Sequence, residues 1–168
     1  MRSGPRQESG FTIVEMIITT CIVAVLASIA ISSYRDFARR AKMSEIVLAT
    51  GQCKNAVQEN YPVLDTPLAA GRWGCEGQGT SYYAGAVETS TDGVIRVLIR
   101  NLDSGVNDHY IYLIPTKADG VSPLQASSDV GTAVRGWMCG SDWLPVRNAS
   151  PANCRADTTS YLYSTTFN

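Results

Sequence analysis

The chain has 168 residues, which suits one domain with an appended segment and leaves little room for two full domains. Apolar residues make up 45% of the chain, enough for a packed core, so the composition argues against wholesale disorder. The formal net charge of -1 lacks the basic excess that drives general binding to nucleic acids.

The chain contains five cysteines, an odd number. None of them lies in a C-x-x-C pair or beside a histidine at ligand spacing, so a zinc site is poorly supported and no metal or cofactor is expected. If the chain is exported, its soluble part meets an oxidising compartment, in which disulfides persist. The count then predicts two disulfides in the exported part and one remaining cysteine, Cys21, inside an apolar segment.

The N-terminal part divides into a short polar stretch and a long apolar one. Residues 1–10 are polar, and residues 11–33 are apolar apart from Glu15 and a few small hydroxyl side chains. From Met16 the run is uncharged over the roughly 20 residues that a membrane-spanning helix needs. A cleaved secretory signal is the first alternative, but it needs an apolar region of only about 7–15 residues before its cleavage site. Here the apolar run is longer and continues directly into a helical pattern, which favours a membrane anchor.

The orientation of this anchor rests on two opposing observations. Three arginines follow the span (Arg35, Arg39, Arg40) and two precede it (Arg2, Arg6), so the positive-inside rule by count favours the reverse orientation. We nevertheless predict that the N-terminal stretch lies inside, because this orientation places the later cysteines in an oxidising compartment.

Beyond the apolar segment the periodicity remains helical. No proline lies between Pro5 and Pro62, so we predict one helix from Phe11 to Tyr61. Its first half lacks a polar face, whereas its second half is amphipathic and would form the spine of a soluble domain. Apolar residues recur there at spacings of about three and four and form one stripe: Phe37, Ala41, Ile46, Ala49, Cys53, Ala56, Val57 and Tyr61.

After a loop rich in glycine, proline and small residues, the period changes to two. Residues 82–89 and 94–100 predict two strands, and Thr91-Asp92-Gly93 between them suits a hairpin turn. Residues 109–114 (HYIYLI) predict a third strand that Pro115 ends, and residues 134–138 are a candidate fourth. We therefore expect an α+β fold in which an antiparallel sheet of about four strands packs on the long helix.

Glu15 is the most unusual residue of the apolar segment. A charge in the bilayer core costs roughly 2–3 kcal/mol or more, so the carboxylate needs a cationic partner. Cleavage after Gly10 would create a free amine at Phe11. Within one rigid helix this amine and Glu15 point apart, so a neighbouring subunit is the better source of the amine. The alternative is an acid tolerated near the membrane interface.

A short basic leader that ends in Gly10, followed by FTIVEM and an apolar helix, closely resembles the signature of type IV prepilins. The resemblance implies that a prepilin peptidase cuts between Gly10 and Phe11 and that Phe11 becomes N-methylated. It also implies that Glu15 helps to dock the subunit into the growing filament. The segment RAKMSE, residues 40–45, is similar to the RAKxSE segment of many major pilins.

The C-terminal part resembles the same family. The segments WMC and CR are similar to the two ends of a disulfide-closed loop in pilins, which implies a bond between Cys139 and Cys154. The second expected pair is Cys53 and Cys75, which would hold the loop after the helix to the helix itself. The implied pilin fold is a long helix with an apolar first half, packed on the sheet, with the disulfide-bonded loop near the C-terminus.

The resemblance is strongest over residues 7–61 and 134–155 and weak in the sheet, and the chain departs from the family pattern in three places. Family members usually have proline near the position of Ser32, and many have glycine near Ala24. These residues kink the helix and let it unwind in filaments, so we predict a straighter and more continuous helix here. Residues 156–168 extend beyond the usual end, and Tyr161-Leu162-Tyr163 could add an edge strand or cover one.

The resemblance implies a structural subunit of type IV pili and not an enzyme. The expected domains are a leader (1–10), the membrane and assembly half of the helix (11–33), and a globular head (34–168). Expected partners are other copies of the chain, a prepilin peptidase, the pilus assembly machinery and the inner membrane, with a host surface or DNA as further candidates. The family implies adhesion, twitching motility and DNA uptake by an extracellular pilus of a Gram-negative bacterium.

Other functions remain open at this point. A minor pilin or a type II secretion pseudopilin is the nearest alternative; RAKMSE and two cysteine pairs favour a major pilin, and the missing helix proline weakens that choice. A single-span, membrane-anchored periplasmic binding domain would need neither Gly10-Phe11 nor Glu15. An enzyme is weakly supported, because the only histidine, His109, has no recognisable nucleophile motif near it and is expected to be solvated at a strand edge.

Overall fold

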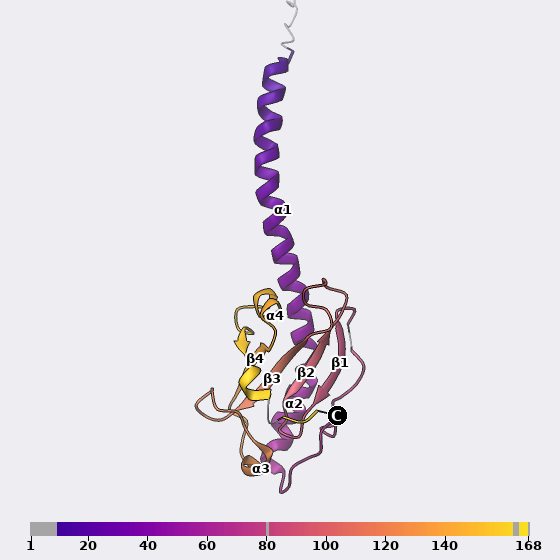
Figure 1. Cartoon of the computed structure of the whole chain (residues 1–168), viewed down its shortest axis with the longest axis vertical. Helices are drawn as coiled ribbons and strands as arrows, with labels where there is room; N and C mark the ends of the chain where they lie inside the picture. The colour runs from indigo at the N-terminus through magenta and orange to yellow at the C-terminus, as the bar shows by residue number, and fades with distance from the viewer. Residues whose placement is uncertain (1–9, 80, 163–164, 168) are drawn as a thin grey trace, which may run out of the picture. The chain divides into compact units, whose positions relative to one another are not determined.

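The computed structural model describes residues 10–79, 81–162 and 165–167 (Figure 1). The chain divides into two compact units, which meet in the sequence at Phe37 and Ala38. Helix α1, Ile13–Ala49, begins in the first unit and ends in the second. Each unit is described by itself below.

In the first unit, α1 is an uninterrupted helix that passes through both Ala24 and Ser32, as we predicted for this chain without the family's glycine and proline. Three hydroxyl side chains of this apolar stretch donate to backbone carbonyls three or four residues earlier: Thr19 to Glu15, Thr20 to Met16 and Ser28 to Val25. These hydroxyls therefore have partners within the helix, which an apolar environment requires.

In the second unit, the helix predicted as one element is interrupted at Thr50. Helix α1 ends at Ala49, α2 runs over Gly51–Asn60, and the 3₁₀ turn η1 covers Tyr61–Val63. The hydroxyl and the N–H of Thr50 both donate to the carbonyl of Val47, at 2.6 and 3.2 Å. Such bonding tightens the local turn, and the following glycine supports a helix poorly.

One stripe of α1 and α2 is buried against the sheet, and each of its members is at most 1% exposed: Met43, Ile46, Thr50, Cys53, Val57 and Tyr61. The predicted stripe was right for Ile46, Cys53, Val57 and Tyr61. It was wrong for Phe37 and Ala41, which are exposed. Ala41 precedes Ile46 by five residues and so lies about 140° away around the helix.

The sheet has five strands in the order β1-β2-β3-β4-β5. The first four strands pair antiparallel, and the two-residue β5 pairs parallel with β4. The predicted antiparallel sheet of about four strands on a long helix is confirmed, and β5 is an addition. The bounds are Ala84–Thr89 (β1), Ile95–Ile99 (β2), Tyr110–Thr116 (β3), Gly136–Ser141 (β4) and Ala156–Asp157 (β5), with short helices Ala126–Asp129 (α3), Leu144–Ala149 (α4) and Thr159–Leu162 (α5).

Strand β3 continues through Pro115, which we predicted would end it. Pro115 pairs with Trp137 of β4, whereas the pairing of β3 with β2 stops at Leu113. The carbonyl of Pro115 accepts a hydrogen bond from the N–H of Leu124 at 2.9 Å. Because β2 does not extend as far as the position opposite Pro115, the missing N–H of the proline costs no hydrogen bond of the sheet.

The sheet carries an apolar cluster on each face. The larger cluster packs with the stripe of α1 and α2 and includes Ile111 and Leu113 of β3. The smaller one has Val94, Tyr112 and Ile114 as its buried residues, and side chains of the C-terminal segment pack against it. Strand β3 is therefore buried on both faces, as its unbroken apolar run suggests.

The C-terminal segment settles the two alternatives left open for residues 161–163. Tyr161 and Leu162 pack on the smaller cluster and so cover the sheet, while Ala156–Asp157 supplies the edge strand. Tyr163 lies outside the described residues.

Candidate assembly and surface sites

The residues predicted for processing and assembly lie at the start of α1. Gly10 and Phe11 precede the helix and are exposed, Phe11 by 72%, and Glu15 lies in the first turn. The two residues that flank the predicted cleavage site are thus not buried by the part of the chain that the structure describes. The rest of the predicted leader, residues 1–9, lies outside the described residues.

Glu15 also belongs to a local capping arrangement that the sequence analysis did not note. Its backbone N–H donates to the hydroxyl of Thr12 at 3.3 Å, and the spacing T-x-x-E is that of a capping box. A negative charge in the first turn is favourable beside the positive end of the helix dipole. In the described part of the chain, no cation lies within ion-pair distance of the Glu15 carboxylate. In an apolar environment, its charge therefore requires a cation from elsewhere.

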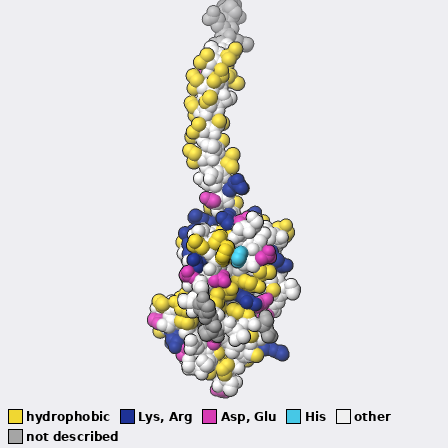
Figure 2. All heavy atoms as spheres, in the orientation of Figure 1, with side chains coloured by type: hydrophobic (Ala, Val, Ile, Leu, Met, Phe, Trp, Pro, Cys, Tyr) yellow, Lys and Arg dark blue, Asp and Glu magenta, His cyan; other side chains and the backbone are white. Residues whose placement is uncertain are grey.

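The first half of α1 exposes apolar side chains on all sides. The large ones between Ile13 and Ile31 are 54–80% exposed, and Figure 2 shows them in yellow along the helix. The helix is long and apolar enough to cross a membrane. Because α1 has no polar face here, contact with a single surface would leave apolar side chains exposed on its other sides. Lipid, or several helices of the same kind, would cover it on every side.

The structure pairs Cys53 with Cys75 and Cys139 with Cys154, across 22 and 15 residues of sequence. These are the two pairs that the sequence analysis expected, and Cys21 is the free cysteine among the described residues. The first bond ties α2 to the loop after η1, and the second closes the segment from β4 through α4. Closing a loop of this size contributes about 3 kcal/mol, mainly by restricting the unfolded chain.

Glu76, beside Cys75, holds the same loop through hydrogen bonds. Its carboxylate accepts from the N–H groups of Trp73 (2.8 Å), Gly74 (2.9 Å) and Cys75 (3.0 Å), and from the hydroxyl of Thr89 in β1. Burial raises the pKa of this carboxyl, but the bonds from Thr89 and the backbone outweigh burial, so the pKa lies below its ordinary value. Sequence reasoning missed Glu76, because Thr89 reaches it from 13 residues away.

The second disulfide loop contacts the loop between β2 and β3 through an aromatic pair. The rings of His109 and Trp143 stack with centroids 4.6 Å apart and planes 5° apart. The indole N–H of Trp143 donates to the carbonyl of Gly105 at 3.2 Å. His109 lies just before β3, near the expected strand edge, and it is half-buried rather than solvated. Its contacts are those of a packed side chain.

The RAKMSE segment serves the head in two ways. Met43 is fully buried in the main core, and the ammonium of Lys42 lies 5.0 Å from the centroid of the Tyr83 ring. Arg40 and Glu45 are exposed. The segment thus combines core packing with one exposed positive and one exposed negative charge.

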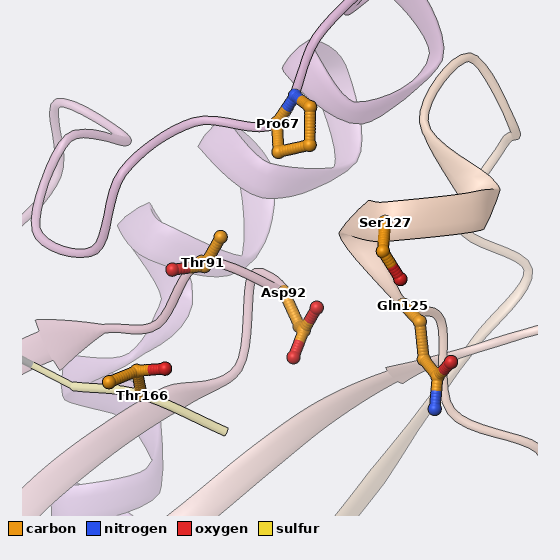
Figure 3. Close-up of a pocket in the computed structure, with 6 residues that line it drawn as sticks. All are labelled: Pro67, Thr91, Asp92, Gln125, Ser127 and Thr166. Carbon is orange, nitrogen blue, oxygen red and sulfur yellow. The ribbon is translucent and has the colours of Figure 1, made fainter. Parts of the chain in front are cut away.

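An open hollow lies between the β1–β2 turn and α3 (Figure 3), lined by Pro67, Thr91, Asp92, Gln125, Ser127 and Thr166. Asp92 already accepts a hydrogen bond from the N–H of Ala126 at 2.8 Å. Within the described residues, no group of three or more His, Cys, Asp or Glu side chains could hold a metal ion. The hollow therefore offers neither a metal site nor a recognisable catalytic group.

The comparisons with known proteins agree on one kind of molecule. A family model described as a pilin of bacterial filaments matches residues 39–155, which contain the first four strands and both disulfides. A fimbrial protein of Neisseria meningitidis strain Z2491 is 30% identical over 166 residues, covering 89% of this chain and 81% of the relative. A fimbrial protein of strain MC58 is 33% identical over 144 residues, covering 85% and 69%. A type IV major pilin of Neisseria gonorrhoeae is 43% identical over 67 residues, covering 39% and 36%.

Proposed function

We propose, from the premise that this chain belongs to the type IV pilin family of filament subunits, that it is a processed and polymerised subunit of a surface pilus. In this proposal a prepilin peptidase removes residues 1–10 by cutting between Gly10 and Phe11, and Phe11 is N-methylated. Residues 11–33 serve as membrane anchor and then as assembly helix, and residues 34–168 form the head. Members of the family are structural proteins and not enzymes.

The observation that supports the proposal best is the exposed apolar surface of α1. In the inner membrane, lipid covers this surface. When subunits leave the membrane, helices of neighbouring subunits replace the lipid, and covering apolar area from water contributes about 25 cal/mol per Å². Close packing of such helices depends on small residues, which Ala24, Ala27, Ser28 and Ala30 provide on this helix.

Glu15 would select the position at which a new subunit enters. After cleavage, the methylated amine of Phe11 remains positively charged and lies at the helix end of each subunit. A neighbouring subunit can bring this amine to Glu15, which has no cationic partner among the described residues. Pairing removes the cost of a lone charge in an apolar bundle, so a correctly placed subunit is favoured over a displaced one.

The head would form the outer coat of the filament. Two disulfides suit an extracellular location, because they persist under oxidising conditions. The proposal includes the pilus assembly machinery as a partner, and adhesion, twitching motility and DNA uptake as the functions that the family implies. It assigns no residue to a host surface or to DNA.

The test is the intact, non-reduced mass of the protein in filaments sheared from cells that express it. The proposal expects a dominant species of residues 11–168 with one added methyl group and four hydrogens fewer, two for each disulfide. The same mass as a trace component of the filaments would indicate a minor pilin. Processed protein found only in a secretion system would indicate a pseudopilin. An uncleaved mass confined to membranes would refute the filament proposal and favour an anchored binding domain.

A further inference from the structure

One end of the head carries basic and aromatic side chains that the proposed function leaves without a role. The head begins at Ala38, inside α1, and three cations follow within about one helical turn: Arg39, Arg40 and Lys42. Two tyrosines just before β1 and an arginine just after β2 lie at the same end of the head. We call this set the basal patch: Arg39, Arg40, Lys42, Tyr82, Tyr83 and Arg100.

Contacts within the head bring the three segments of the basal patch together. The ammonium of Lys42 in α1 lies 5.0 Å from the ring centroid of Tyr83. The N–H of Arg100 donates to the carbonyl of Tyr83 at 2.9 Å. The rings of Tyr82 and Tyr83 meet edge to face, with centroids 5.2 Å apart. The patch is therefore set by the fold of the head, because residues far apart in the sequence meet there.

The basal patch has an excess of positive charge. Arg39 is neutralised by Asp103, with 2.8 Å between their charged groups. The ion pairs among the described residues include none of the other three cations of the patch. Glu45, an exposed acid further along α1, offsets at most one of them. The four cations of the patch thus face two acids and retain a net positive charge, which favours an anionic partner.

A tyrosine side chain is exposed beside these charges. Tyr82 is 71% exposed, and its carbonyl accepts a hydrogen bond from the side-chain amide of Asn101 at 2.8 Å, which holds the backbone that carries the ring. Tyrosine is favourable at the headgroup level of a bilayer, where its ring meets apolar groups and its hydroxyl meets water. Lysine and arginine bind phosphate groups at the same level. The patch thus combines the side chains that suit a lipid headgroup layer.

The place of the basal patch in the chain keeps it close to the membrane anchor. Ala38, the first residue of the head, follows Ser33, the last residue of the proposed anchor, by five residues. A chain extends by at most about 3.5 Å per residue, so Ala38 stays within roughly 18 Å of the anchor whatever the arrangement of the two units. The headgroups around the anchor are therefore within reach of the patch.

We propose that the basal patch binds the anionic phospholipid headgroups of the membrane that holds the subunit before assembly. The inference rests on the membrane anchor of the proposed function. Arg40, Lys42 and Arg100 contact the lipid phosphates. Tyr82 enters the headgroup layer. The contact gives arginines that follow the span, which the positive-inside rule counts against our orientation, a partner on the outer side. Because salt screens such contacts, the head can leave the membrane when the subunit enters a filament.

The experiment measures how fast the Lys42 ammonium reacts with a neutral, water-soluble acylating reagent in the full chain embedded in lipid nanodiscs. One set of nanodiscs contains phosphatidylcholine only, and the other an equal mixture of phosphatidylcholine and phosphatidylglycerol. Peptide mass spectrometry follows Lys42 and, as an internal reference, Lys117, which comes directly after the far end of β3. We expect Lys42 to react about fivefold more slowly in the mixed nanodiscs, and Lys117 about equally fast in both, because each cation at an anionic surface shifts docking about fivefold.

Matched variants separate binding through the basal patch from mere closeness to a charged membrane. Arg100→Gln removes a cation of the patch, whereas Arg135→Gln removes an exposed arginine whose N–H donates to Thr116 at the far end of β3. In mixed nanodiscs, Arg100→Gln should restore most of the Lys42 reactivity, and Arg135→Gln should behave like the wild type. Equal Lys42 rates in these two variants would overturn the proposal, as would equal wild-type rates in the two kinds of nanodisc.

A further arm distinguishes lipid headgroups from free phosphate. Inorganic phosphate is added to the phosphatidylcholine nanodiscs, and the Lys42 rate should stay unchanged. Protection of Lys42 by phosphate ions as strong as that by phosphatidylglycerol would overturn the lipid as the ligand of the patch.

Failure of the proposed function would be recognised separately. Absence of the protein from sheared filaments would refute the filament subunit and leave the nanodisc result unaffected. A chain that does not enter nanodiscs would refute the anchor, and the patch is then tested by sedimentation of the full chain with vesicles of the same two compositions. Weaker sedimentation of Arg100→Gln than of Arg135→Gln with the mixed vesicles would uphold the patch as a lipid-binding surface, and equal sedimentation would overturn it.

Discussion

His109 and Trp143 stack with their rings 4.6 Å apart, although 34 residues of sequence separate them. The stack joins the loop before β3 to the second disulfide loop, and the hydrogen bond from the Trp143 indole to Gly105 lies beside it. Trp143 is 45% exposed, so the contact is a surface clamp between two loops and not part of the core.

We expect Trp143→Ala to lower the free energy of unfolding by about 1 kcal/mol, the usual contribution of one stacked pair. Trp143→Phe keeps a ring but loses the bond to Gly105, so it should cost less. The measurement is denaturant unfolding of the detergent-solubilised, disulfide-intact chain. A double-mutant cycle with His109→Ala is the control, and strictly additive effects would show that the two rings are not coupled.

Glu76→Gln should destabilise the head at neutral pH and remove part of its acid sensitivity. Because the pKa of Glu76 is lowered on folding, its stabilisation is fully present above the unfolded pKa of about 4.5 and is lost as pH falls through the folded pKa. Replacing a carboxylate that accepts several hydrogen bonds by a neutral amide costs about 1–2 kcal/mol at pH 7.

The measurement for Glu76 is the free energy of unfolding from pH 7 down to pH 3. The matched control is Asp65→Asn, an exposed acid earlier in the same loop. The difference between wild type and Glu76→Gln should shrink as the pH falls below 4.5. A difference that stays constant over this range would contradict the assigned role of the carboxylate.

Two glycines of the head should respond to alanine in opposite directions. An added Cβ at Gly51 meets nothing within 4 Å, so Gly51→Ala should stabilise the start of α2 by about 0.5 kcal/mol. Gly93 has a φ of +76°, and a Cβ there would lie 2.9 Å from Val57. Gly93→Ala should therefore destabilise the head by roughly 1–3 kcal/mol. The measurement is the melting temperature of each variant compared with that of the wild type. A Gly51→Ala variant that melts no higher than the wild type, or a Gly93→Ala variant that melts no lower, would contradict the expectation for that glycine.

Glu15→Gln should reduce filament yield without preventing membrane insertion or leader cleavage. If an ion pair worth about 2–3 kcal/mol guides entry of each subunit, its loss should lower the yield of sheared filaments at least tenfold. Glu45→Gln, an exposed glutamate of the same helix, is the matched control. Normal yield from Glu15→Gln would remove this carboxylate from the assembly mechanism.

The apolar half of α1 should remain helical in the filament. The structure shows an unbroken helix through Ala24 and Ser32, neither of which favours a kink as glycine or proline would. A filament map that resolves the helices would show continuous density over this stretch. An unwound segment between Ala24 and Ser32 would disprove the expectation.

The sequence alone determined the features that repeat over short distances. The apolar run beginning with FTIVEM predicted the apolar first half of α1, the alternation in residues 94–100 predicted β2, and Thr91-Asp92-Gly93 predicted the turn before it. Each of these depends on the local period of the chain and on backbone preferences of single residues. The same local signals identified the family to which the chain belongs.

Tertiary structure decided the rest, because the contacts join residues that no local period relates. Phe167 reaches Arg96 across 71 residues, and Thr89 reaches the Glu76 carboxylate across 13. The phase of the buried stripe also depended on the sheet, which selects Met43 and Thr50 in place of Phe37 and Ala41. The sequence around a polar or aromatic side chain is compatible with many different hydrogen-bond or packing partners. Only the folded sheet, with a helix on one face and the side chains of Tyr161, Leu162 and Phe167 on the other, selects one of them.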